Sequence, residues 1–109
     1  MRQQPLRFRD PYLHALRRLF VRSLAQQRFR GQDYVSWSEF QQLWTPELFQ
    51  RQGRDTTDIV VSKIDYTKPY SAQNICLTTR SQALRCQKYF QSYGWPIGID
   101  PTYIIRTIP

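Results

Sequence analysis

The sequence predicts an α+β fold, a small and mostly helical single domain that contains a strand–loop–strand–helix unit. Two observations support this prediction. Apolar residues recur at helical spacing along most of the chain, whereas two short runs, Ile59–Val61 and Ile75–Leu77, have the composition of strands. A length of 109 residues with 40% hydrophobic residues suits one domain with one small core.

The chain divides into three expected segments. Residues 1–9 form a flexible N-terminal segment, 10–94 form the folded domain, and 95–109 form an apolar tail. The tail contains a strand-like run at Tyr103–Arg106. This run either adds an edge strand to the sheet or docks on a partner or a second copy.

A first helix is expected to begin at Asp10, a favourable N-cap residue, with Pro11 in the first helical position. It is expected to run to about Arg30 and to stop at Gly31. Apolar residues at helical spacing form its expected buried stripe: Leu13, Leu16, Phe20 and Leu24. Residues 1–30 contain eight arginines and one acidic residue, Asp10, so acidic partners for the arginines are almost absent.

Two further helices are expected before the first strand. Ser36 and Glu39 match a capping box, which starts a helix with an apolar and aromatic face that we assign to the core: Trp37, Phe40, Leu43 and Trp44. A short helix is then expected from Pro46 to about Gln52, before Gly53.

The central stretch follows the order strand, long turn, strand and helix. Pro69 lies in the turn, where it removes a backbone donor. Thr79 and Gln82 match a capping box at the start of a last helix, which is expected from about Arg80 to Tyr93. Asp65 caps the turn and Asn74 hydrogen-bonds the loop back onto itself in the favoured interpretation of these two residues.

A spaced set of residues in this stretch matches a known motif: Val61-Ser62-Lys63-Ile64-Asp65, Tyr70, Asn74, Leu77, Thr79 and Gln82, with Trp37 and Phe40 upstream. The chain therefore resembles phage-encoded proteins related to HNH homing endonucleases over roughly residues 12–90. The resemblance implies a ββα scaffold, with Asp65, Tyr70 and Asn74 as its motif residues. It also places the last helix against a nucleic-acid backbone.

The resemblance does not extend to the residues of catalysis. In HNH nucleases a histidine precedes Ile-Asp and the helix supplies a further metal ligand, but this chain has Lys63 and Ala83–Cys86 at these places. A protonated lysine does not ligate a metal. We therefore expect no catalytic residue, no metal site and no cofactor. An active nuclease would need an unexpected ligand set, such as Asp65 with His14, the single histidine.

The net charge of +8 favours polyanions or acidic protein surfaces as partners. Thirteen of the sixteen basic residues are arginine, the residue suited to bidentate contact with phosphate or carboxylate. No apolar run is long enough to span a membrane and the start lacks the apolar stretch of a signal peptide, so the cytoplasm of a bacterial host is the expected location. In that compartment Cys76 and Cys86 are expected as buried thiols, with a disulfide as the alternative.

Two hypotheses about function follow, from different classes. The first is a phage or mobile-element protein that binds nucleic acid, with DNA as the favoured partner, without cleaving it. Its contacts would come from basic residues: Arg17, Arg18, Arg22, Arg28, Arg30, Lys63, Lys68, Arg80, Arg85 and Lys88. The second is an inhibitor that binds a host protein with an acidic surface, such as a nuclease, a polymerase, or CRISPR or restriction machinery. Its apolar tail, 95–109, would then anchor the partner.

Overall fold

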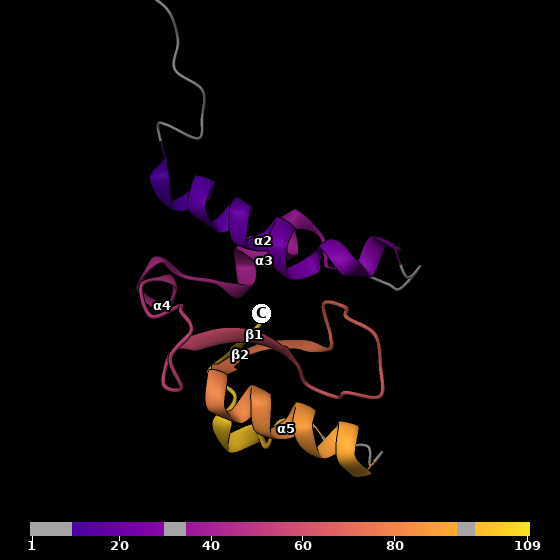
Figure 1. The fold of residues 1–109 in the computed structure, drawn as a ribbon. Coiled ribbons are helices and arrows are strands. Elements are labelled where there is room, and N and C mark those ends of the chain that lie inside the picture. The colour runs from indigo at the N-terminus through magenta and orange to yellow at the C-terminus, as the bar shows by residue number, and fades with distance from the viewer. Residues whose placement is uncertain (1–9, 30–34, 94–97) are drawn as a thin grey trace, which may run out of the picture.

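The computed structural model describes residues 10–29, 35–93 and 98–109. In chain order these form α2 (Pro11–Phe29), α3 (Trp37–Leu43), α4 (Pro46–Phe49), β1 (Ile59–Lys63), β2 (Ile75–Thr79), α5 (Arg80–Tyr93), the 3-10 helix η1 (Pro101–Tyr103) and β3 (Arg106–Thr107). The α+β class and the strand–loop–strand–helix unit are confirmed (Figure 1). The segment 1–9 and the predicted helix stops Gly31 and Gly94 lie outside the described residues.

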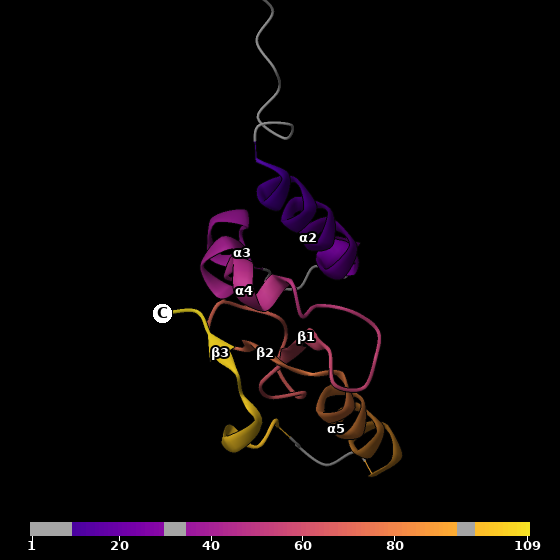
Figure 2. The same ribbon diagram turned by 90° about the vertical axis from the view of Figure 1, so that its left-hand side faces the viewer.

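The three strands form an antiparallel sheet in the order β1–β2–β3. Ile59 pairs with Thr79 and Lys63 with Ile75, so β1 and β2 are matched along their whole length. Helices α2 and α3 lie on one side of the sheet and α5 lies on the other, as both views show (Figures 1 and 2). The central strand β2 is therefore covered on both faces.

Two hydrophobic clusters lie on the two faces of the sheet. The larger one is built under α2 and α3 from Leu16, Leu19, Phe20, Val35, Phe40, Leu43, Trp44, Ile59, Ile75 and Leu77. The smaller one lies toward α5 and contains Cys76, Cys86 and Ile99. Alternate residues of β2 enter different clusters because successive side chains of a strand point to opposite faces.

Helix α2 begins as predicted, since the Asp10 carboxylate accepts a hydrogen bond of 3.1 Å from the Leu13 N–H. The predicted buried stripe is wrong at Leu13, which is 36% exposed. The buried stripe instead includes Leu19 and begins at the half-buried Tyr12, which packs against the larger cluster. Leu16 and Phe20 stay in the buried stripe as predicted, while Leu13, about 100° around the helix from Tyr12, lies at its border. The side chain of Leu24 lies outside the described part.

The capping box at the start of α3 is confirmed. The Glu39 N–H donates to Ser36 Oγ at 3.1 Å, and the Ser36 N–H donates to Glu39 Oε1 at 2.9 Å. The core assignment of the face is confirmed for Phe40, Leu43 and Trp44, which are buried, and Trp37 is half-buried against them.

Helix α4 is shorter than predicted, because it ends at Phe49 and not near Gln52. The Ile59 N–H donates to the Arg51 carbonyl at 2.8 Å, and Gln52 forms a β-bridge with Ile59. The backbone that would have continued the helix is therefore engaged by the first strand. Pairing with β1 therefore determines where the helix ends, and not Gly53, which the sequence suggested as its stop.

The tail adds the edge strand that was one of its two predicted roles. In this strand Arg106 pairs with Leu77. The predicted strand-like run began earlier, at Tyr103, but Tyr103 belongs to a 3-10 turn that Asp100 caps. Ile99 is buried and donates its N–H to the Ile64 carbonyl at 2.9 Å.

Gly98 and Arg106 also fit the tail to the rest of the fold. A side chain on Gly98 would collide with the Ile64 carbonyl, so glycine permits the close passage of the tail beside the end of β1. Arg106 donates from its guanidinium to the carbonyls of Leu43 at 3.0 Å and Gln42 at 3.1 Å. The tail is therefore part of the folded structure, and its backbone at the sheet edge is engaged with β2.

Cys76 and Cys86 are buried free thiols, as predicted. Burial raises the pKa of Cys76 to about 12 and raises the pKa of Cys86 as well. Among the described residues, no helix combines the length and the apolar character that crossing a membrane requires.

Candidate nucleic-acid interface

The loop between β1 and β2 is held closed by the motif residue Asn74, which is 6% exposed. Its Oδ1 accepts a hydrogen bond of 2.7 Å from the Asp65 N–H. Its Nδ2 donates to the carbonyls of Asp65 at 2.9 Å, Pro69 at 3.0 Å and Lys68 at 3.3 Å. The interpretation of Asn74 as a residue that fastens the loop is confirmed.

Asp65 caps the turn within this loop, also as predicted. Its Oδ1 accepts from the Thr67 N–H at 2.9 Å and from the Thr67 hydroxyl at 2.6 Å. The hydroxyl bond is the main reason that the pKa of Asp65 lies below its usual value, and the backbone bond adds to it. The exposed Lys68 ammonium lies 4.0 Å from the other carboxylate oxygen.

Lys63 lies at the end of β1, where its ammonium is 5.0 Å from the centre of the Tyr70 ring. This is a cation–π contact. Tyr70 packs against the larger cluster, and burial raises the pKa of its hydroxyl. The motif residues therefore stabilise the loop, and Lys63 has a partner within the protein.

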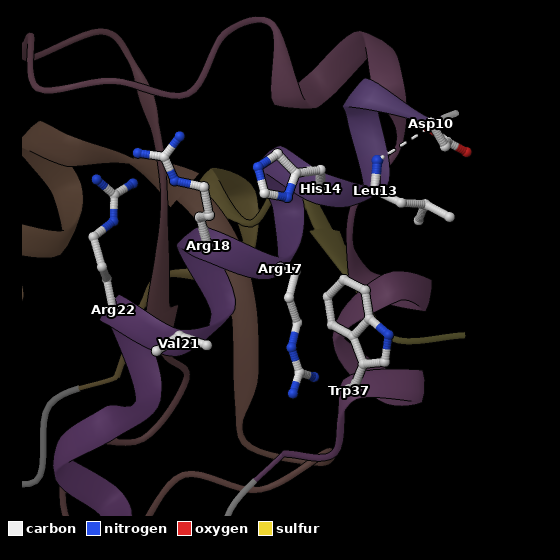
Figure 3. A pocket seen from close by; sticks show the side chains of 8 residues that line it. All are labelled: Asp10, Leu13, His14, Arg17, Arg18, Val21, Arg22 and Trp37. Atoms are coloured by element: carbon white, nitrogen blue, oxygen red, sulfur yellow. Dashed lines mark hydrogen bonds between the residues drawn. The ribbon is translucent and has the colours of Figure 1, made fainter. Parts of the chain in front are cut away.

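An open hollow of about 750 Å³ lies along the exposed face of α2 (Figure 3). Its lining residues are Asp10, Leu13, His14, Arg17, Arg18, Val21, Arg22 and Trp37. Seven of them come from α2 and its cap, and they share one face because residues three and four apart are neighbours on a helix. Trp37 of α3 forms one wall.

The arginines of this hollow are held in different ways. The Arg17 guanidinium lies 5.2 Å from the ring centres of both Phe20 and Trp37, which orient it by cation–π contact. Arg18 and Arg22 extend in the same direction, away from Arg17 and Trp37 (Figure 3). Neither of these two has an ion-pair partner within the described part of the chain.

A second open hollow, of about 290 Å³, adjoins the first and shares Arg22 with it. Its lining residues are Leu19, Arg22, Ser23, Trp44, Gln52, Gly53, Arg54, Val60, Val61 and Arg80. It thus brings together Arg22 from α2, Arg54 from the connector before β1, and Arg80 from the start of α5. No acidic residue lines it.

Arg54 was not among the predicted contact residues. It lies in a polar connector beside Asp55 and close to Asp58, which suggests local neutralisation. In the structure the Asp58 carboxylate instead accepts from the Asp55 backbone N–H at 3.0 Å. Aspartates often cap turns in this way, and a carboxylate used for capping is less available to an arginine. This tendency was the signal in the sequence that could have identified Arg54 as unpaired.

Arg85 and Lys88 are exposed on the outer face of α5, where they line a third hollow of about 560 Å³. This face lies on the opposite side of the sheet from α2 (Figure 1). Apart from Lys63 and Lys68, which lie at the β1–β2 loop, the structure divides the predicted basic residues with described side chains into two groups. One group contains Arg17, Arg18, Arg22 and Arg80, and the other contains Arg85 and Lys88. The side chain of Arg28 and the whole of Arg30 lie outside the described residues.

The hypothetical ligand pair His14 and Asp65 comes from two different parts of the structure. His14 lies in the α2 hollow beside arginines, and the Asp65 carboxylate is engaged by Thr67. Over residues 10–29, 35–93 and 98–109, no three side chains of the His, Cys, Asp and Glu types gather as they would around a metal ion.

Comparison with known proteins gives no match, since no family model, no curated protein and no solved structure is detectably similar to the chain. The resemblance to HNH-related proteins therefore remains a prediction from the motif residues.

Proposed function

We propose that this protein binds nucleic acid, with DNA as the favoured partner, through the arginines of α2 together with Arg54 and Arg80, and that it does so without cleaving the strand. The observation that carries the proposal is the adjoining pair of hollows that share Arg22. They place Arg18, Arg22, Arg54 and Arg80 on one surface, although these residues come from three separate parts of the chain.

The chemistry of this surface suits a phosphate backbone. Each guanidinium presents several N–H donors in a planar fork that matches phosphate oxygens. Because Arg18, Arg22, Arg54 and Arg80 lack ion-pair partners among the described residues, their charge is not neutralised within the protein. Contacts to phosphate carry no base information, so the proposed binding is sequence-independent and sensitive to salt.

One observation favours the host-protein inhibitor as a second candidate. Leu13 and Val21 are exposed beside the arginines, and Val21 is 51% exposed. Arginine is enriched at protein interfaces, and the buried centre of an interface is more apolar than the rest of the surface. The tail would not act as a free anchor in this case, since Ile99 and Arg106 hold it on the fold. The partner would therefore meet the α2 face.

The test measures fluorescence anisotropy of a labelled duplex at several salt concentrations. Arg22 is the residue that both hollows share, so Arg22→Glu is compared with Arg51→Glu. Arg51 is exposed and lines none of the three hollows, and its reversal changes the net charge equally. We expect Arg22→Glu to weaken binding for all sequences and to reduce the log–log salt slope by about 0.9 for each phosphate that the protein no longer neutralises.

The double variant Arg18→Glu with Arg22→Glu should enlarge this effect. Equal losses in Arg22→Glu and Arg51→Glu would refute the proposed surface, because net charge alone would then account for binding. Duplex affinity of the unmodified protein no tighter than about 10⁻⁴ M at physiological salt would favour the second candidate.

A further inference from the structure

The outer face of α5 carries a feature that the arginine surface of α2 does not explain. Three large side chains are exposed there: Leu84 at 47%, Tyr89 at 41% and Tyr93 at 59%. With Arg85 and Lys88 they line the hollow of about 560 Å³. Tyr89 and Tyr93 are four residues apart and are therefore neighbours on the helix, whereas Leu84 lines the other border of the same hollow.

This outer face is not what holds α5 on the protein. The inner face contacts the sheet through Cys86, which belongs to the smaller cluster. It contacts the β1–β2 loop through Phe90, whose ring lies 6.2 Å from that of Tyr66. The Tyr66 hydroxyl also donates to the Ala83 carbonyl at 3.0 Å. Attachment of the helix therefore does not require the exposed ring of Tyr89.

Tyr89 and Tyr93 form an aromatic pair on this surface. Their ring centres are 5.6 Å apart and their planes differ by 33°. The Tyr89 ring, which is 41% exposed, offers a flat π-face onto which any nucleobase can stack regardless of its identity. A duplex keeps its bases stacked internally, so only unpaired bases could use this pair.

The charges around the pair match the phosphates of such a strand. Helix α5 contains Arg80, Arg85 and Lys88 and no acidic residue. Arg85 lies one helical turn before Tyr89, and Lys88 lines the same hollow, so cationic groups lie near the ring. A base on the ring would therefore have basic side chains close to its own phosphates.

We propose that the outer face of α5 is a stacking platform for unpaired nucleobases, centred on Tyr89, with Arg85 and Lys88 contacting the adjoining phosphates. This inference rests on the proposed nucleic-acid binding and names its partner more narrowly as a single strand. The α2 surface, on the other side of the sheet, contacts phosphates of either form.

The experiment compares three labelled probes by anisotropy: a thymidine oligomer of about 12 nucleotides, within ordinary single-strand site sizes, an abasic oligomer with the same number of phosphates, and a duplex of equal length. The variants are Tyr89→Leu, which keeps apolar bulk but removes the π-face, and Tyr89→Phe, which keeps the π-face. Circular dichroism checks that both variants remain folded.

We expect Tyr89→Leu to weaken thymidine-oligomer binding by about 5- to 150-fold, the range for loss of one stacked base. Tyr89→Phe should retain the binding, and neither variant should change the affinity for the abasic oligomer or the duplex. Equal affinity for thymidine and abasic oligomers, with duplex binding intact, would overturn the platform and leave the proposed function standing. Failure of the unmodified protein to bind any of the three probes would overturn both and favour a protein partner.

Discussion

Substitution of Asn74 by alanine is expected to destabilise the protein by about 2–4 kcal/mol. The Asn74 side chain accepts one hydrogen bond, at 2.7 Å, and faces three backbone carbonyls with two N–H hydrogens. Asn74 therefore makes three good hydrogen bonds at any one time, one as acceptor and two as donor. Each contributes about 0.5–1.5 kcal/mol net to the free energy of unfolding. Because Asn74 is buried, the Asp65 N–H loses its partner in a place that water reaches poorly.

Equilibrium unfolding in urea, followed by tryptophan fluorescence, measures this loss as a change in the free energy of unfolding. The matched control is Asn74→Asp, which keeps the acceptor oxygen and the shape but removes both donors. Burial against three carbonyl oxygens should raise the pKa of the introduced carboxyl group. Its stability relative to the unmodified protein should then be best below the unfolded pKa of about 4 and should fall as the pH rises through the folded value.

The reasoning fails if Asn74→Ala costs less than about 1 kcal/mol, since a single ordinary hydrogen bond would then account for the effect. It also fails if Asn74→Asp matches the unmodified protein at neutral pH. Either result would mean that the loop is closed by other contacts.

Two further predictions concern the titratable groups. Burial raises the pKa values of Cys76 and Cys86, so iodoacetamide should alkylate neither thiol in the native protein at about pH 8. Both thiols should react after unfolding, as mass spectrometry would show. Rapid modification of the native protein would contradict their burial. Because the Thr67 hydroxyl lowers the pKa of Asp65, this carboxylate contributes stability above its unfolded pKa and loses it as the pH falls through the lowered folded value. Urea unfolding from about pH 6 down to about pH 2 should therefore show a shallower loss of stability in Asp65→Asn than in the unmodified protein; parallel curves would exclude the contribution.

Local signals in the sequence predicted where the helices begin. The helix starts at Asp10, Ser36 and Thr79 follow from side chains that accept a backbone N–H three residues ahead. The roles of Asp65 and Asn74 follow from the same short-range chemistry, although Asn74 reaches nine residues back. Such bonds depend mainly on residues close in sequence, which is why a pattern can reveal them.

Local patterns failed where packing decided between similar neighbours. Both Leu13 and Tyr12 can belong to an apolar stripe, and the angle at which α2 packs leaves Leu13 exposed. The end of α4 was misplaced because β1 engages the Arg51 carbonyl. In each case the local sequence allowed more than one conformation, and contact with a distant segment determined which one formed.

The sequence by itself determined the α+β class, the strand–loop–strand–helix order, the capped helix starts and the excess of arginine. Only the tertiary structure decided which charges lie near one another on the surface. Arg22, Arg54 and Arg80 line one hollow, and Lys63 lies against Tyr70. Arg85 and Lys88 lie on the other side of the sheet. The physical reason is that hydrogen-bonded caps and strand composition are local, whereas the sharing of a surface depends on how the helices pack across the sheet.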